Sequence, residues 1–66
     1  MIKVFYWPGN RLTKIIGLNQ TDIILHNCVV ENQGKGQIRI MQQTEGAWLC
    51  MYQLPTARTT VIYKWD

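Results

Sequence analysis

The sequence is poor in the side chains that most often perform catalysis. It contains no serine, a single histidine and four acidic residues. The acids are scattered along the chain, and no two of them can be placed at the separation that general acid–base chemistry needs. They are Asp22, Glu31, Glu45 and Asp66. We therefore expect a protein that is not an enzyme and that uses no cofactor.

His26 and Cys28 form the one arrangement with catalytic potential. Residues two positions apart on a strand share a face, so an imidazole there could activate the thiol. No second histidine and no suitably spaced acid supports such a site. We expect His26 to be a partly buried residue between apolar runs, and we predict no metal site.

Cysteine is also scarce, since Cys28 and Cys50 are the only two. Two cysteines are too few for a disulfide framework, and the lack of a CxxC pair argues against structural zinc. We expect buried free thiols, with one bridge left open if the strands that carry them are neighbours. Residues 1–9 hold one lysine and a short apolar run that ends at Pro8, unlike a signal peptide or membrane span. The expected free thiols and the lack of a signal-peptide pattern in residues 1–9 both favour a cytoplasmic protein.

Apolar residues are abundant. They make up 47% of the 66 residues, whereas charged residues make up 17%, a balance too apolar for a disordered chain. A single domain of this size buries only about 60% of its unfolded surface, so a monomer would be marginally stable. The apolar surplus therefore predicts that another subunit or a partner covers part of the surface, and we expect a homo-oligomer.

Turn residues divide the chain into six predicted strands. These are residues 2–7, 11–18, 23–31, 37–43, 47–54 and 58–65. The spacing predicts one all-β domain over residues 1–66, a five- or six-stranded antiparallel barrel or strongly curved sheet. Length and strand count are those of small OB, cold-shock and SH3-like barrels, but the signature motifs of these families are absent and no family is assigned.

The segment 23–31 allows an alternative. Thr21 or Asp22 could cap a helix there. The β-branched isoleucines and valines of this segment lose rotamer freedom in a helix, and its apolar positions form no stripe at helical spacing. We favour a strand and keep the helix as the alternative.

Alternation assigns side chains to the two faces of each strand. In 37–43, Ile38 and Ile40 oppose Arg39 and Met41. In 47–54, Leu49 and Met51 oppose Trp48, Cys50 and Tyr52; in 58–65, Val61, Tyr63 and Trp65 oppose Arg58, Thr60, Ile62 and Lys64. The strands 2–7 and 47–54 are apolar on both faces, so both faces need cover, and an interface with another subunit or a ligand is predicted.

Basic and aromatic residues favour a nucleic-acid-binding module. The net charge is +3, and small β-barrels bind single strands by stacking bases on rings while cations hold the phosphates. The predicted phosphate contacts are Lys3, Lys14, Arg39, Arg58 and Lys64, and the predicted stacking rings are Trp48, Tyr52 and Trp7. Lys35 lies in the glycine-rich segment 32–36, which we expect to be a hairpin tip rather than a phosphate loop.

The alternative is a protein-binding module, such as an inhibitor or an assembly factor. The residues at the centre of its interface would be Trp7, Trp48, Tyr52 and Trp65, because Trp and Tyr are enriched at such positions. Each of these rings, taken singly, is also an ordinary core candidate. Salt-dependent binding of oligonucleotides would separate the first hypothesis from the second.

Overall fold

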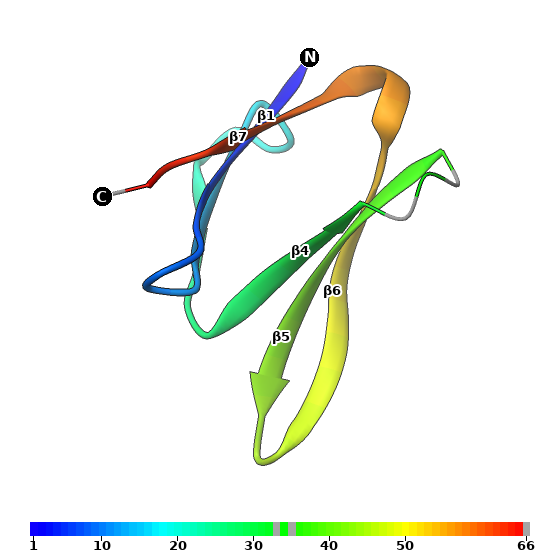
Figure 1. Ribbon diagram of the computed structural model, residues 1–66. Coiled ribbons are helices and arrows are strands. Elements are labelled where there is room, and N and C mark those ends of the chain that lie inside the picture. Colours follow the sequence, from blue (N-terminus) through cyan, green and yellow to red (C-terminus); the bar gives the residue numbers. More distant parts are fainter. Residues whose placement is uncertain (33, 35, 66) are drawn as a thin grey trace.

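The strands form two sheets that face each other. The computed structural model describes residues 1–32, 34 and 36–65, and over these residues the chain is all-β, with one short 3-10 helix (Figure 1). The four-stranded sheet has the order β3-β2-β1-β7, and its strands are Ile23–Leu25, Leu12–Ile16, Ile2–Trp7 and Thr59–Tyr63. The three-stranded sheet has the order β4-β5-β6, with strands Cys28–Asn32, Gln37–Thr44 and Ala47–Pro55. The all-β prediction is confirmed, while the described strand pairings do not close into a barrel.

The first hairpin forms where the turn residues predict it. β1 pairs antiparallel with β2, from Lys3 opposite Ile16 to Trp7 opposite Leu12. In the turn, the Asn10 N–H donates to the Trp7 carbonyl (3.2 Å) and the Arg11 N–H to the Pro8 carbonyl (3.3 Å). Proline fixes the φ angle at the first corner of this turn, which explains why β1 ends where it does.

The predicted strand 23–31 is two strands in different sheets. β3 ends at Leu25 and β4 begins at Cys28, so neither one continuous strand nor the helical alternative is correct. Between them Asn27 has a φ of 59°, a conformation that asparagine tolerates better than most residues. The chain passes from one sheet to the other at this point. The Cys28 N–H, at the start of β4, donates a hydrogen bond to the Arg11 carbonyl beside β2 (3.0 Å).

β7 pairs with β1 in parallel, although only antiparallel neighbours were expected. Thr59 lies opposite Ile2, and Tyr63 lies opposite Tyr6. The 3-10 helix η1 (Thr56–Arg58) connects β6 to β7. It places the start of β7 beside the start of β1, so the two strands run in the same direction. Arg58, predicted as a strand residue, belongs to this helix.

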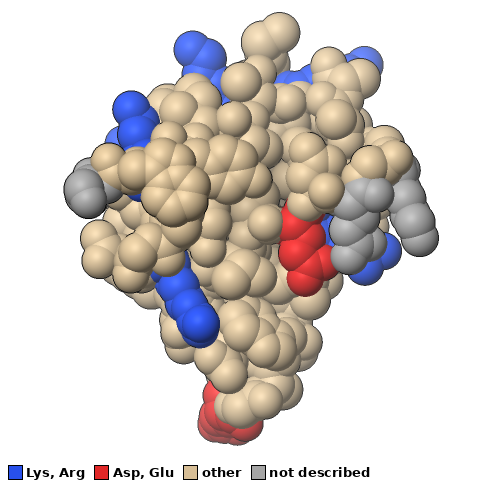
Figure 2. Space-filling view, viewed as in Figure 1, with Lys and Arg blue, Asp and Glu red and all other residues tan. Residues whose placement is uncertain are grey.

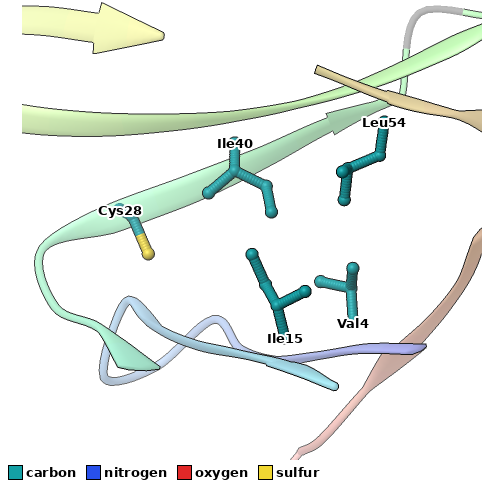
Figure 3. Close-up of a cluster of buried hydrophobic side chains, with 5 residues drawn as sticks. All are labelled: Val4, Ile15, Cys28, Ile40 and Leu54. Atoms are coloured by element: carbon teal, nitrogen blue, oxygen red, sulfur yellow. The ribbon is translucent and has the colours of Figure 1, made fainter. Parts of the chain in front are cut away.

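The core lies between the two sheets. Val4 and Ile15 reach from the four-stranded sheet toward Cys28, Ile40 and Leu54 of the three-stranded sheet (Figure 3). Burying one such aliphatic side chain contributes about 1.5–3 kcal/mol. Thr13 is fully buried beside them, and its hydroxyl shares a 2.8 Å hydrogen bond with the Cys28 thiol. Because the core uses one face of each sheet, the opposite faces are left for contact with solvent or ligands.

β6 departs from the predicted alternation through a β-bulge. Tyr52 lies opposite Ile40, but Cys50 lies opposite Met41, so Met51 is an extra residue on β6. Tyr52 therefore packs against the core and does not share a face with Trp48 and Cys50 as predicted. Beyond the bulge, residues 47–51 are all exposed; we call this segment the β6 arm. Figure 1 shows the turn between β5 and β6 at the end of the molecule, beyond the four-stranded sheet.

Candidate nucleic-acid interface

The outer face of the four-stranded sheet gathers lysines and aromatic rings. Phe5 of β1 lies opposite Lys14 of β2 and Ile62 of β7, and Lys3 lies opposite Ile16 and Thr60. Residues opposite each other in register share a face, and this face points away from the buried Val4. We call this surface the lysine face and define it by Lys3, Phe5, Trp7, Lys14, Ile16 and Lys64.

Two neighbouring depressions of about 270 Å³ each hollow this surface. One is lined by Phe5, Trp7, Lys14, Ile16 and Lys64. The other, which we call the Trp65 pocket, is lined by Trp7, Gly9, Asn10, Lys64 and Trp65. Because Trp7 and Lys64 line both, the two depressions lie side by side, and we call the pair the track.

Lys64 is positioned by its backbone and by a ring. Its N–H donates to the Tyr6 carbonyl (2.8 Å), which extends the pairing between β1 and β7 by one residue. Its Nζ lies 5.7 Å from the centroid of the Phe5 ring, within the range of a cation–π interaction. The ammonium group is thus held at the junction of the two depressions.

Lys14 has an acidic neighbour. Its Nζ lies 3.7 Å from Oδ2 of Asp22, and both side chains are substantially exposed. An exposed pair of this kind contributes only about 0–1 kcal/mol, because water screens both charges. A phosphate can therefore replace Asp22 as the partner of Lys14 at little cost.

Trp65 is the most exposed ring of the molecule's described part, with 77% of its surface accessible. One side of the indole stacks on Tyr63, with centroids 6.3 Å apart and planes at 16°. Tyr63 in turn meets Tyr6 edge to face, with centroids 6.0 Å apart. Tyr6 is buried, and this burial raises the pKa of its hydroxyl. A chain of three rings therefore supports Trp65 from one side and leaves its other side open.

The structure brings together only some of the predicted site residues. Lys3, Lys14, Lys64 and Trp7 share the lysine face, with Trp65 at its end. Arg39 lies on the other sheet, opposite Glu31 and Gln53, and Arg58 lies in η1. The predicted rings Trp48 and Tyr52 also belong to the other sheet. The five predicted cations are therefore divided between separate elements.

Several residues near these surfaces were not predicted as site residues. Phe5 and Asn10 line the depressions, and the Arg11 guanidinium carbon lies 5.9 Å from the centroid of the Trp48 ring. Alternation along β1 places Phe5 on the same face as Trp7, so the sequence does carry a signal for Phe5. The position of Arg11 depends on contact between the two sheets, for which the sequence offers no signal.

The predictions for histidine and cysteine need correction. His26 is exposed, not partly buried, and the break between β3 and β4 separates it from the strand that carries Cys28. Both thiols are free, but only Cys28 is buried, whereas Cys50 is exposed on the β6 arm. Burial raises the pKa of the Cys28 thiol. Two residues of the predicted hairpin tip 32–36, Gln33 and Lys35, lie outside the described residues.

Comparison with known proteins adds no function to this geometry. No family model, curated protein or solved structure that was compared with the chain matches it. Within the described residues, no group of three or more His, Cys, Asp or Glu side chains is placed to hold a metal ion. Over the same residues, no helix has the length and apolar character required to cross a membrane.

Proposed function

We propose that this chain is a non-enzymatic module that binds single-stranded nucleic acid on its lysine face. One observation carries the proposal: Lys3, Lys14 and Lys64 lie beside the rings of Phe5 and Trp7 on one outer sheet face. Lysines attract the phosphate backbone, and exposed rings stack on bases that are not paired. The two free thiols support a cytoplasmic location, where thiols stay reduced.

The shape of the face favours a single strand over a duplex. Its depressions are lined by Phe5, Trp7 and Trp65 as well as by lysines. A duplex hides the faces of its bases and would use only the lysines, whereas an unpaired base can stack for about 1–3 kcal/mol. A ring-bearing face therefore adds affinity for a single strand that it cannot add for a duplex.

The salt dependence of binding tests this proposal. Three phosphate contacts on a single strand predict a slope of about −2 for log K against log salt. Fluorescence anisotropy with a labelled oligothymidylate should therefore show an affinity loss of roughly 20-fold between about 50 and 200 mM salt. Absence of binding at the lower salt concentration, or an affinity that salt does not change, would refute the proposal.

A second candidate function, protein binding, is favoured by the β6 arm. All of residues 47–51 are exposed and none is charged, and Trp48, Leu49 and Met51 are 42%, 50% and 41% accessible. β6 is also the last strand of its sheet, so one edge of its backbone has no neighbouring strand among the described residues. Natural edge strands usually carry charges that prevent pairing with another chain, and this segment has none.

A second copy of this chain is the partner that we propose for the β6 arm. Two identical uncharged strands can pair antiparallel about a two-fold axis, and the sheets of the two copies then become continuous. The protein as a whole is positively charged and Arg11 lies against Trp48, but the arm itself contributes no charge to the contact. Sedimentation equilibrium should show a dimer, and a strictly monomeric protein at high concentration would exclude this candidate.

A further inference from the structure

The Trp65 pocket has the features of a site for one nucleobase. Trp7 and Trp65 supply two rings, Lys64 a cation, and Gly9 and Asn10 a polar turn. We propose that this pocket holds a single unpaired base of a bound strand, with the adjacent phosphate on Lys64. This inference rests on the proposed function of the lysine face and adds a defined subsite to it.

Size argues for one flat ring system. The pocket measures about 270 Å³, just below the roughly 300–1,000 Å³ range of sites for drug-sized ligands. One side of Trp65 is already stacked on Tyr63, so only its other side can accept a ring. A planar base on that side would be stabilised by about 1–3 kcal/mol.

Asn10 gives the pocket a means of contacting the edge of a base. Its side-chain amide carries both donors and an acceptor and makes no hydrogen bond to any described residue. The backbone hydrogen bonds from Asn10 to Trp7 and from Arg11 to Pro8 hold the turn in position. Asparagine amides in such positions bond to the exposed edges of unpaired bases. The turn therefore presents an unused amide beside the two rings.

The neighbouring depression provides the path for the rest of the strand. It begins at Trp7 and Lys64 and continues to Phe5, Ile16 and Lys14. With a base in the Trp65 pocket and its phosphate on Lys64, the next nucleotide enters the depression beside Phe5 and Ile16, and its phosphate lies near Lys14. Rings and cations thus alternate along the track in the same way as bases and phosphates alternate along a strand.

The test compares two ligands of equal length and charge, an oligothymidylate and an abasic sugar–phosphate oligomer. Their affinities are measured by competition for the wild type and for the Trp65→Ala, Asn10→Ala and Trp48→Ala variants. Trp48→Ala is the matched control, because it removes an exposed indole from the other sheet. Circular dichroism checks that each variant is folded, which we expect for Trp65→Ala because this side chain is largely exposed.

We expect Trp65→Ala to weaken oligothymidylate binding by roughly 5- to 100-fold, the equivalent of one lost stacking contact. Asn10→Ala should weaken it by a smaller factor, and Trp48→Ala should leave it unchanged. None of the three should alter the affinity for the abasic oligomer. A spectroscopic check uses a variant with Trp7→Phe and Trp48→Phe, in which the fluorescence of Trp65 should be quenched by oligothymidylate but not by the abasic oligomer.

Two outcomes would overturn the base pocket while leaving the proposed function intact. In the first, oligothymidylate binds more tightly than the abasic oligomer, but Trp65→Ala changes neither affinity. In the second, Trp65→Ala weakens both ligands by the same factor, which would assign the pocket to the backbone. Failure of both ligands to bind at low salt would instead overturn the proposed function itself, and the pocket with it.

Discussion

The lysine face and the β6 arm both carry large apolar side chains at the surface, yet they differ in charge and in burial. On the lysine face, the half-buried Phe5 and Trp7 lie next to lysines on a sheet that rests on the core. The β6 arm has no charge, is exposed along its whole length and lies at the edge of the smaller sheet. In Figure 2, the surface over β5 and β6 is mostly uncharged, and the Lys and Arg groups lie mainly toward the margin of the view.

This difference separates two uses of exposed aromatic residues. A ring beside a cation suits a ligand that is itself alternately flat and anionic, such as a single strand. A ring on an uncharged edge strand suits the backbone and side chains of another protein. Trp65 and Trp48 each have a cation nearby, Lys64 and Arg11. Trp65, however, lines a pocket beside the larger sheet, whereas Trp48 belongs to an edge segment that itself carries no charge.

The largest expected effect comes from removing the cations of the lysine face. Lys14→Ala combined with Lys64→Ala should weaken oligothymidylate binding on the order of 100-fold, because each charged contact contributes about 1.5 kcal/mol or more. Arg39→Ala combined with Arg58→Ala removes the same charge from other elements and should change affinity less than about threefold, through long-range attraction alone. An equal loss of affinity in the two double variants would show that binding depends only on net charge, and the lysine face would then not be a specific site.

The second effect concerns the β6 arm. Leu49→Lys should weaken dimer formation by roughly 30-fold, since an unpaired charge in an apolar contact costs about 2 kcal/mol. Sedimentation equilibrium measures this change, and oligothymidylate affinity should stay within about twofold of wild type. Thr60→Lys, which adds the same charge to the four-stranded sheet, is the control and should leave the dimer unaffected. A loss of nucleic-acid binding in Leu49→Lys would mean that the two regions act as one site.

A smaller effect is expected from the acid beside the lysine face. Asp22→Asn frees Lys14 from its exposed ion pair and removes a negative charge near the bound phosphates. Oligothymidylate affinity should rise by about threefold at low salt, and the gain should shrink as salt is added. Unchanged affinity would indicate that Lys14 does not contact the strand, and the track would then end at Lys64.

The smallest expected effect is a dependence of folding stability on pH, which arises from two buried groups of the core and not from the β6 arm. Burial raises the pKa of Cys28 and Tyr6 in the folded chain, so the unfolded chain loses these protons first as pH rises. The free energy of unfolding should be at its full value below about pH 8.5 and should decline above it. Urea unfolding at several pH values measures this change.

The two thiols supply the control for this pH effect. Cys28→Ala should reduce the alkaline decline, because it removes the buried thiol whose pKa burial raises. In the native protein, a maleimide should label Cys50 and spare Cys28 until the chain unfolds. Labelling of both thiols at the same rate would show that the region around Cys28 opens in the native state.

Local signals account for the parts of the fold that were predictable. β1 and its turn follow from six strand-forming residues and then Pro8 and Gly9, and the alternation of Ile38 and Ile40 with Arg39 holds in the structure. The division at Asn27 depends on one residue with positive φ inside an apolar stretch. The bulge at Met51 depends on pairing with β5. Neither feature leaves a periodic signal in the sequence.

The candidate site was only partly predictable for a similar reason. Alternation shows that Lys3, Phe5 and Trp7 share a face of β1, but Lys14 and Lys64 join them only through the registers of β1 with β2 and β7. The parallel pairing with β7 was not expected, and it is what brings Lys64 over Phe5. Arg39 and Arg58 fitted the same charge pattern equally well, and long-range pairing places them elsewhere.

The salt dependence of binding in the two charge-matched double variants tests the central claim most directly. The lysine face predicts a slope of log K against log salt near −2 for the wild type and for Arg39→Ala/Arg58→Ala. For Lys14→Ala/Lys64→Ala it predicts a slope of about −0.7, since one phosphate contact remains at Lys3. Two results would contradict the assignment of the lysine face as the nucleic-acid-binding surface. The slope could become shallower by the same amount in both variants, or it could stay near −2 in the variant that lacks Lys14 and Lys64.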